Sequence, residues 1–150
     1  MTTKSRAATG PIVLDTNVVS ELMRAAPDEQ VEDWVRTVPP ANVYTTSVTL
    51  AEVRFGIARL PPGRRRALLA DAADDVFGAF ADRVLPFDAD AADEYGDVVV
   101  EREHIGAPIT GFDAQIAAIC RSRRAALATR NIDDFRRLGL DLVDPWRTGI

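Results

Sequence analysis

The feature that most constrains the fold of this chain is a regular alternation of short apolar runs with longer segments of helical periodicity. The short runs are aliphatic or β-branched, which is typical of buried strands. Strands are expected at residues 11–14, 43–46, 84–87, 125–129 and 142–143, and helices at 17–25, 28–38, 48–60, 64–81, 89–103, 112–123 and 132–138. Strands separated by helices pair in parallel through right-handed crossovers. The alternation therefore predicts an α/β fold, a three-layer α/β/α sandwich with a mainly parallel central sheet.

The length of the chain suits one such domain. With 150 residues and a 47% hydrophobic composition, the chain can bury a single core, which we expect within residues 11–150. Residues 1–10 are polar and rich in Ala, Ser and Thr, which predicts a flexible tail and not a signal peptide. No apolar run approaches the roughly 20 residues needed to span a membrane. Cys120 is the only cysteine and cannot form an internal disulfide, which favours a reducing, cytoplasmic location.

Carboxylates follow several of the expected strands or open the neighbouring helices. They are Asp15, Glu52, Asp113, Asp133 and Asp134. Ligand sites in open parallel sheets lie beyond the carboxyl ends of the strands, so we expect these acids to gather at one edge of the sheet. Oxygen ligands without a histidine or cysteine cluster indicate Mg²⁺ or Mn²⁺ rather than zinc. The pattern thus points to metal-dependent phosphodiester chemistry.

Most of these acids also have a purely structural interpretation. Thr49–Glu52, Thr110–Asp113 and Asn131–Asp134 each match the pattern of a helix N-terminal capping box. Acids at helix starts gain roughly 0.3–1 kcal/mol from the helix dipole. Asp15 differs, because a lone charge at the end of a buried strand is costly to hold. Several carboxylates at one edge would also repel each other without a cation, so the set as a whole favours the metal site.

The basic residues narrow the possible mechanisms. Lys4 is the only lysine, whereas P-loop nucleotide hydrolysis and receiver-type phosphorylation each rely on a lysine beside the phosphate. The net charge of −5 argues against a broad, sequence-independent DNA-binding protein. Arginine suits phosphate oxygens because its guanidinium is a bidentate fork. The candidates for contact with substrate phosphates are Arg64, Arg65, Arg66, Arg121, Arg123, Arg124, Arg130, Arg136 and Arg137. The alternative is that they form solvated helix surfaces paired with nearby acids.

Four segments, in order along the chain, carry a family resemblance. They are Ile12–Glu21, Thr46–Gly56, Phe112–Ala118 and Ala128–Phe135, and together with Asp144-Pro145-Trp146 they resemble the motifs of PIN domains. The resemblance runs from about residue 11 to residue 147. The group that the chain resembles most is the VapC/FitB-type toxins of bacterial type II toxin–antitoxin modules.

This resemblance implies an endoribonuclease that depends on Mg²⁺, for which Mn²⁺ can substitute. It implies that Asp15, Glu52 and Asp113 form the metal site. Many relatives have an aspartate where this chain has Asn131, so either Asn131 acts as a neutral ligand or positioning group, or Asp134 completes the catalytic set. The residues expected to support the ligands are Thr16, Asn17, Ser47 and Thr129.

The resemblance also implies partners. A cognate antitoxin is expected to place its helical C-terminal segment in an apolar groove formed by the helices of residues 28–38 and 47–60. RNA is the expected substrate, a homodimer is expected, and no membrane is involved.

Two other interpretations stay open. A haloacid-dehalogenase-like (HAD-like) phosphatase also begins with an aspartate after a buried strand, but it needs a second acid where this chain has Asn17, and it needs a lysine. A non-catalytic PIN-like binding module is the other alternative, because Asn131 replaces an acid. Cleavage of RNA would separate these possibilities from the nuclease.

Overall fold

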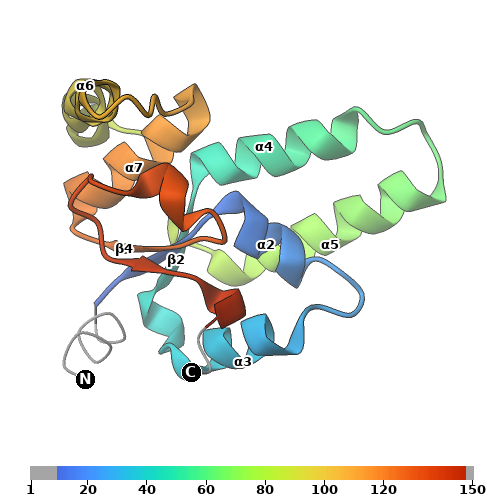
Figure 1. Ribbon diagram of the computed structural model, residues 1–150. Coiled ribbons are helices and arrows are strands. Elements are labelled where there is room, and N and C mark those ends of the chain that lie inside the picture. Colours follow the sequence, from blue (N-terminus) through green and yellow to red (C-terminus); the bar gives the residue numbers. More distant parts are fainter. Residues whose placement is uncertain (1–9, 148–150) are drawn as a thin grey trace.

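A five-stranded sheet forms the centre of the computed structural model, which describes residues 10–147 (Figure 1). The strands are β1 Ile12–Leu14, β2 Val43–Thr46, β3 Val84–Leu85, β4 Ala126–Ala128 and β5 Leu142–Val143. They lie in the order β3-β2-β1-β4-β5, and every neighbouring pair is parallel. The predicted α/β sandwich is therefore confirmed. The tail expected over residues 1–10 lies outside the described residues, except for Gly10.

Helices cover both faces of this sheet. They are α2 Thr16–Leu22, α3 Glu29–Thr37, α4 Ser47–Ala58, α5 Arg64–Phe80, α6 Ala89–His104 and α7 Gly111–Arg123, with the 3₁₀-helices η1 Pro40–Asn42, η2 Ile132–Phe135 and η3 Pro145–Arg147. Helices α6 and α7 cover one face, and α2, α3 and α5 cover the other. Helices α4 and α5 form a hairpin that projects from the body of the molecule (Figure 1, right). None of the helices in residues 10–147 is long and apolar enough to cross a bilayer.

The two central strands, β1 and β4, are buried on both faces of the sheet. Val13 and Leu127 point into the core beneath α6 and α7, whereas Ile12, Leu14 and Ala128 point into the core on the opposite face. Each of these side chains is at most 1% exposed. Burial on both sides explains why the sequences of these two strands are continuous apolar runs and do not alternate between apolar and polar residues.

The order of the strands places a switch point between β1 and β4. The chain runs from β1 to β2 and β3 on one side, then returns to build β4 and β5 on the other side of β1. Ligands bind beyond the carboxyl ends of the strands at such a point, where the connections leave in opposite directions. Asp15 follows β1 and Thr129 follows β4, so the fold brings these two residues to the switch point.

The structure corrects two local predictions. Helix α4 begins at Ser47, and its N-cap is Thr46, whose hydroxyl accepts a hydrogen bond from the Thr49 backbone N–H at 3.0 Å. The interpretation of Thr49–Glu52 as a capping box is therefore wrong, because both residues lie inside the helix. The helix expected at residues 132–138 is only the short η2, because the backbone turns extended at Arg136 and Arg137 has a φ of 69°.

Candidate functional site

Asp15 is a buried carboxylate at the end of the first strand. One of its oxygens accepts a hydrogen bond from the Thr16 backbone N–H at 2.8 Å, and the other accepts from the Thr129 hydroxyl at 2.7 Å. Only 4% of the residue is exposed. Burial raises the pKa of Asp15 to about 6, with both hydrogen bonds opposing the rise and the charges of Asp113 and Glu52 adding to it. The negative charge at this position is therefore poorly compensated by the protein itself.

The Thr129 hydroxyl joins the two strands at the switch point. It donates to Asp15, and it accepts from the Asn131 backbone N–H at 3.0 Å and from the Asn17 side-chain N–H at 3.4 Å. A hydroxyl has one hydrogen and two lone pairs, so Thr129 is saturated. The side-chain oxygen of Asn17 in turn accepts from the Arg130 backbone N–H at 3.2 Å. This network fixes the loop after β4 against the start of α2.

Glu52 is held by a row of threonine hydroxyls. The Thr16 hydroxyl donates to Glu52 Oε1 at 2.7 Å. Because that hydroxyl has a single hydrogen, Thr49 is the donor in the 3.1 Å contact between Thr49 and Thr16. Thr46 donates to Thr49 at 3.4 Å. The row therefore runs in one direction and ends on one carboxylate oxygen of Glu52, beside Asp15.

Asp113 completes the group from the opposite side of the switch point. It lies in the first turn of α7, where its backbone N–H donates to the hydroxyl of the N-cap Thr110 at 3.4 Å. Its side chain is half-buried. Burial raises the pKa of Asp113, and the charge of Asp134 raises it further against the effect of Thr110. Asp134 and Asn131 are both exposed, and Asn131 touches the network through its backbone N–H.

These acids fit a hard divalent cation without forming a closed cage. Within residues 10–147, no three His, Cys, Asp or Glu side chains lie close enough together to make a ready-made metal site. In the same part of the chain, no arginine forms an ion pair with Asp15, Glu52 or Asp113. Mg²⁺ usually keeps several waters and binds one or two protein carboxylates together with the substrate phosphate. A buried acid with two neighbouring acids suits that open mode of binding.

Two of the residues in the threonine row were missed by the sequence analysis. Ser47, which was expected to support the ligands, is the half-buried first residue of α4, whereas its neighbours Thr46 and Thr49 make the hydrogen bonds that reach the site. The signal for this row was the spacing of Thr46, Thr49 and Glu52, because residues three apart lie on one face of a helix.

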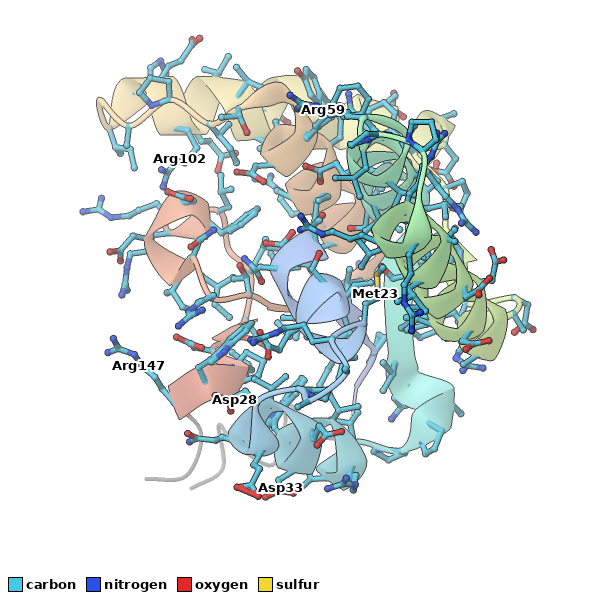
Figure 2. The ribbon with its side chains drawn as sticks, turned by 90° about the vertical axis from the view of Figure 1, so that its right-hand side faces the viewer. Met23, Asp28, Asp33, Arg59, Arg102 and Arg147 are labelled. Atoms are coloured by element: carbon cyan, nitrogen blue, oxygen red, sulfur yellow. The ribbon has the colours of Figure 1, made fainter. Side chains whose placement is uncertain are left out.

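Arg102 was also missed, and it supports the loop that carries Asp134. It lies on α6, is 5% exposed, and donates from Nη1 to the backbone carbonyls of Asp133 at 3.3 Å and Arg136 at 2.9 Å. Figure 2 shows Arg102 between α6 and η2. Its Nε is buried without a hydrogen-bond partner among the described residues. No sequence motif marks this residue.

The arginine candidates occupy three separate places. Arg64 and Arg65 open α5, at the tip of the projecting hairpin. Arg121 and Arg124 lie at the C-terminal end of α7, which leads to the amino end of β4 and thus to the opposite edge of the sheet from the acids. Arg121 is also paired with two glutamates of α6. Arg130, by contrast, directly follows Thr129 at the candidate site.

An apolar hollow opens beside Thr16 and Glu52. Its volume is about 240 Å³, and its walls come from α2, α4 and α5. Helix α2 packs against both α3 and α4, and much of the apolar surface expected to form a groove between those two helices belongs to the core. Val31, Val53 and Ile57, for example, are buried there. The hollow at the site is therefore built differently from the predicted groove.

Comparisons with known proteins agree with this architecture. The PIN domain model matches residues 12–140. The chain is 40% identical over 136 residues to the VapC ribonuclease Y4jK of Sinorhizobium fredii, covering 90% of the chain and 97% of that protein. It is 33% identical over 136 residues to the toxin FitB of Neisseria gonorrhoeae, covering 90% and 98%. The crystal structure of FitAcB from Neisseria gonorrhoeae matches with a TM-score of 0.83 at 33% identity, covering 91% of this chain and 99% of that chain. The chain therefore belongs to the PIN domain family, in the group that contains VapC and FitB.

Proposed function

We propose that this protein is a Mg²⁺-dependent endoribonuclease and the toxin of a type II toxin–antitoxin module. The observation that carries the proposal is the burial of Asp15 beside two other acids at the switch point, with no arginine paired to it in the described part of the chain. Such a cluster is unfavourable unless a cation joins it. The names of the relatives, VapC ribonuclease and toxin FitB, support the same activity.

The carboxylates of Asp15 and Asp113 are the groups that would hold Mg²⁺ directly, and Glu52 would complete the metal site through a bound water. Once bound, the ion would polarise the scissile phosphate and lower the pKa of a water molecule. Mn²⁺ is expected to substitute, because it accepts the same oxygen ligands.

The side chains of the protein orient the water and receive its proton. Thr16 holds Oε1 of Glu52, so Oε2 is the atom that we assign as proton acceptor, and Asp113 is the group that orients the water. The water oxygen attacks phosphorus while the bond to the 3′-oxygen breaks, and the leaving oxygen takes a proton from solvent. The products are a 5′-phosphate and a 3′-hydroxyl. Asp134 or Asn131 is proposed as the fourth member of the set.

The partners form part of the same proposal. The hollow beside Thr16 and Glu52 is adjacent to the site, so a helical antitoxin segment seated there would block access to it. Phe55 and Leu68 on the neighbouring hairpin are 61% and 55% exposed, which supports a further apolar contact surface. We also propose a homodimer and a cytoplasmic location.

Cleavage of RNA by the purified, antitoxin-free protein tests this function. The wild type with Mg²⁺ is expected to cut RNA, and EDTA is expected to stop it. Asp15→Asn should remove cleavage while circular dichroism shows an intact fold. Asp93→Asn, which changes an exposed acid on α6, is the matched control and should cut like the wild type.

Other outcomes would favour the alternatives. Release of phosphate from small monoesters, with RNA left whole, would replace the nuclease with a HAD-like phosphatase. No reaction with either substrate would favour a non-catalytic binding module. Equal loss of cleavage in Asp93→Asn and Asp15→Asn would remove the role assigned to Asp15.

A further inference from the structure

A polar hollow lies next to the candidate site, on the side of β4. It has a volume of about 840 Å³ and is formed by the loop after β4, η2 and η3. In Figure 2, Arg147 extends from η3 at one end of this region. Asn131 and Asp134 line the hollow, so it opens directly beside the residues assigned to the fourth position of the site. A strand of RNA that places its scissile phosphate at Asp15 has room to continue there.

Arg130 lines this hollow and is held in place there. Its guanidinium carbon lies 4.7 Å from the centre of the Trp146 ring. Trp146 packs against the core on the side of α2 and α3, which makes it a fixed base for the guanidinium. The backbone of Arg130 is fixed as well, because its N–H donates to Asn17 and its neighbour Thr129 donates to Asp15. An exposed arginine is thus anchored one residue from the catalytic network.

The other arginines of the hollow are already paired with acids. Arg136 Nε lies 2.6 Å from Asp133, and Arg147 Nε lies 3.7 Å from Asp144. The guanidinium of Arg130 has no carboxylate partner among residues 10–147. A guanidinium stacked on an aromatic ring keeps its N–H edge free for phosphate oxygens and its second face free for a nucleobase. Among the arginines of the hollow, Arg130 is therefore the one whose guanidinium is both held in place and available to bind a nucleotide.

We propose that Arg130, stacked on Trp146, binds the phosphate of the nucleotide next to the scissile bond in single-stranded RNA. This inference rests on the proposed ribonuclease function and adds a substrate-binding subsite to it. The residues that form the subsite are Arg130 and Trp146, with Asn17 fixing the backbone. The proposed subsite assigns RNA binding to Arg130 and not to the arginines at the hairpin tip or at the C-terminal end of α7.

RNA binding in the absence of cleavage tests the subsite. The probe is a short, fluorescein-labelled single-stranded RNA, titrated by fluorescence anisotropy with Asp15→Asn protein over a series of salt concentrations. Adding Arg130→Gln is expected to weaken binding on the order of tenfold. It should also reduce the slope of log K against log salt by about 0.7, the value for one phosphate contact with a single strand. Arg64→Gln, at the hairpin tip, should change neither quantity.

The role of the stack is tested at Trp146. Trp146→Phe keeps an aromatic ring and should bind RNA nearly as well as the parent, whereas Trp146→Leu should weaken binding and add little to Arg130→Gln. Thermal melting of each variant shows whether the fold is retained, and the Phe variant keeps the test valid if the Leu variant unfolds. An unchanged salt slope in Arg130→Gln, or an equal change in Arg64→Gln, would overturn the subsite.

The two proposals fail in different ways. If wild-type protein does not cut RNA but Asp15→Asn binds it with the Arg130-dependent slope, the nuclease proposal fails and the subsite stands. If wild-type protein cuts RNA and Arg130→Gln cuts and binds equally well, only the subsite fails.

Discussion

The two halves of the candidate site are held in place by different means. Asp15 and Glu52, on the side of β1 and β2, accept hydrogen bonds from threonine hydroxyls that are themselves fixed by the sheet and by α4. Asp113 and Asp134, on the side of α7 and η2, are placed mainly by their backbones, and Asp134 is exposed. The first half is thus held by side-chain hydrogen bonds before any ion arrives, whereas the second depends on its backbone.

The charges of Asp113 and Glu52 raise the pKa of Asp15, so the three acids lie near one another. Even so, the described residues contain no ready-made site with three metal ligands. A carboxylate whose orientation is fixed by one or two hydrogen bonds can bind an ion without first having to reorient. We infer that the side chains on the β1 side define the position of a bound ion.

Within the second half of the site, the larger effect is expected from Asp113→Asn, which removes its half-buried acid. RNA cleavage should fall on the order of 10³-fold, beyond the 10–100-fold typical of a residue that only supports a ligand. Asp134→Asn should reduce it by about tenfold. Initial rates at several Mg²⁺ concentrations measure both. A greater loss in Asp134→Asn would reverse the assignment and make the exposed acid the closer ligand.

Asp15→Asn is expected to stabilise the metal-free protein at neutral pH. The pKa of Asp15 is about 6 in the folded protein and about 4 in an unfolded chain, so the folded state holds this proton more tightly. The contribution of Asp15 to stability is therefore fully present below pH 4 and is lost as the pH rises through 6, a change of up to about 3 kcal/mol.

Urea unfolding in EDTA between pH 4 and pH 8 measures this effect. The difference between Asp15→Asn and the wild type should grow with pH in favour of the variant, and Asp93→Asn should follow the wild type. Parallel pH profiles for wild type and Asp15→Asn would mean that burial of Asp15 carries no such penalty.

Thr129→Val tests directly whether a threonine hydroxyl positions Asp15. The variant keeps the shape of the side chain but removes the hydroxyl that donates to Asp15, so Mg²⁺ affinity is expected to fall about 10- to 100-fold. Thr129→Ser retains the hydroxyl and should bind nearly as the wild type does. Calorimetric titration with Mg²⁺ provides the comparison. Equal affinity in the Val and Ser variants would show that the hydroxyl does not position Asp15.

Thr49→Val is expected to have the smallest effect, because Thr49 reaches Glu52 only through Thr16. We expect about a threefold loss of cleavage rate and a larger loss in Thr16→Val. Kinetics of the two variants under identical conditions give the order. If Thr49→Val is the more damaging of the two, the direction assigned to the hydroxyl row is wrong.

The sequence was sufficient for the architecture because an apolar or β-branched run marked each strand and breaks in the pattern marked most helix ends. The run 43–46 matches β2, and Pro39-Pro40 and Pro61-Pro62-Gly63 bound the helices around it. Parallel pairing of the strands allowed Asp15 and Thr129, which follow two of them, to be expected at one edge. The sequence could not show that Thr46, and not Thr49, caps α4, since both residues fit the pattern of a cap and only the path of the chain out of β2 decides between them.

The arginines show the same limit of sequence reasoning. Arg64, Arg121 and Arg130 look alike in sequence, but one lies at the tip of a hairpin, one is paired with glutamates, and one is stacked on a tryptophan beside the site. Arg102 had no signal, because its partners are backbone carbonyls of a segment far along the chain. Long-range contacts of this kind depend on how the elements pack, which local patterns do not encode.

We propose that a divalent cation binds where Asp15 meets Asp113 and Glu52. Anomalous diffraction from crystals of the wild-type protein grown with Mn²⁺ tests it most directly. A manganese peak is expected within bonding distance of carboxylate oxygens of Asp15 and Asp113, and no peak is expected there in Asp15→Asn crystals. A well-ordered site without manganese in the wild type, or manganese bound only elsewhere, would contradict it.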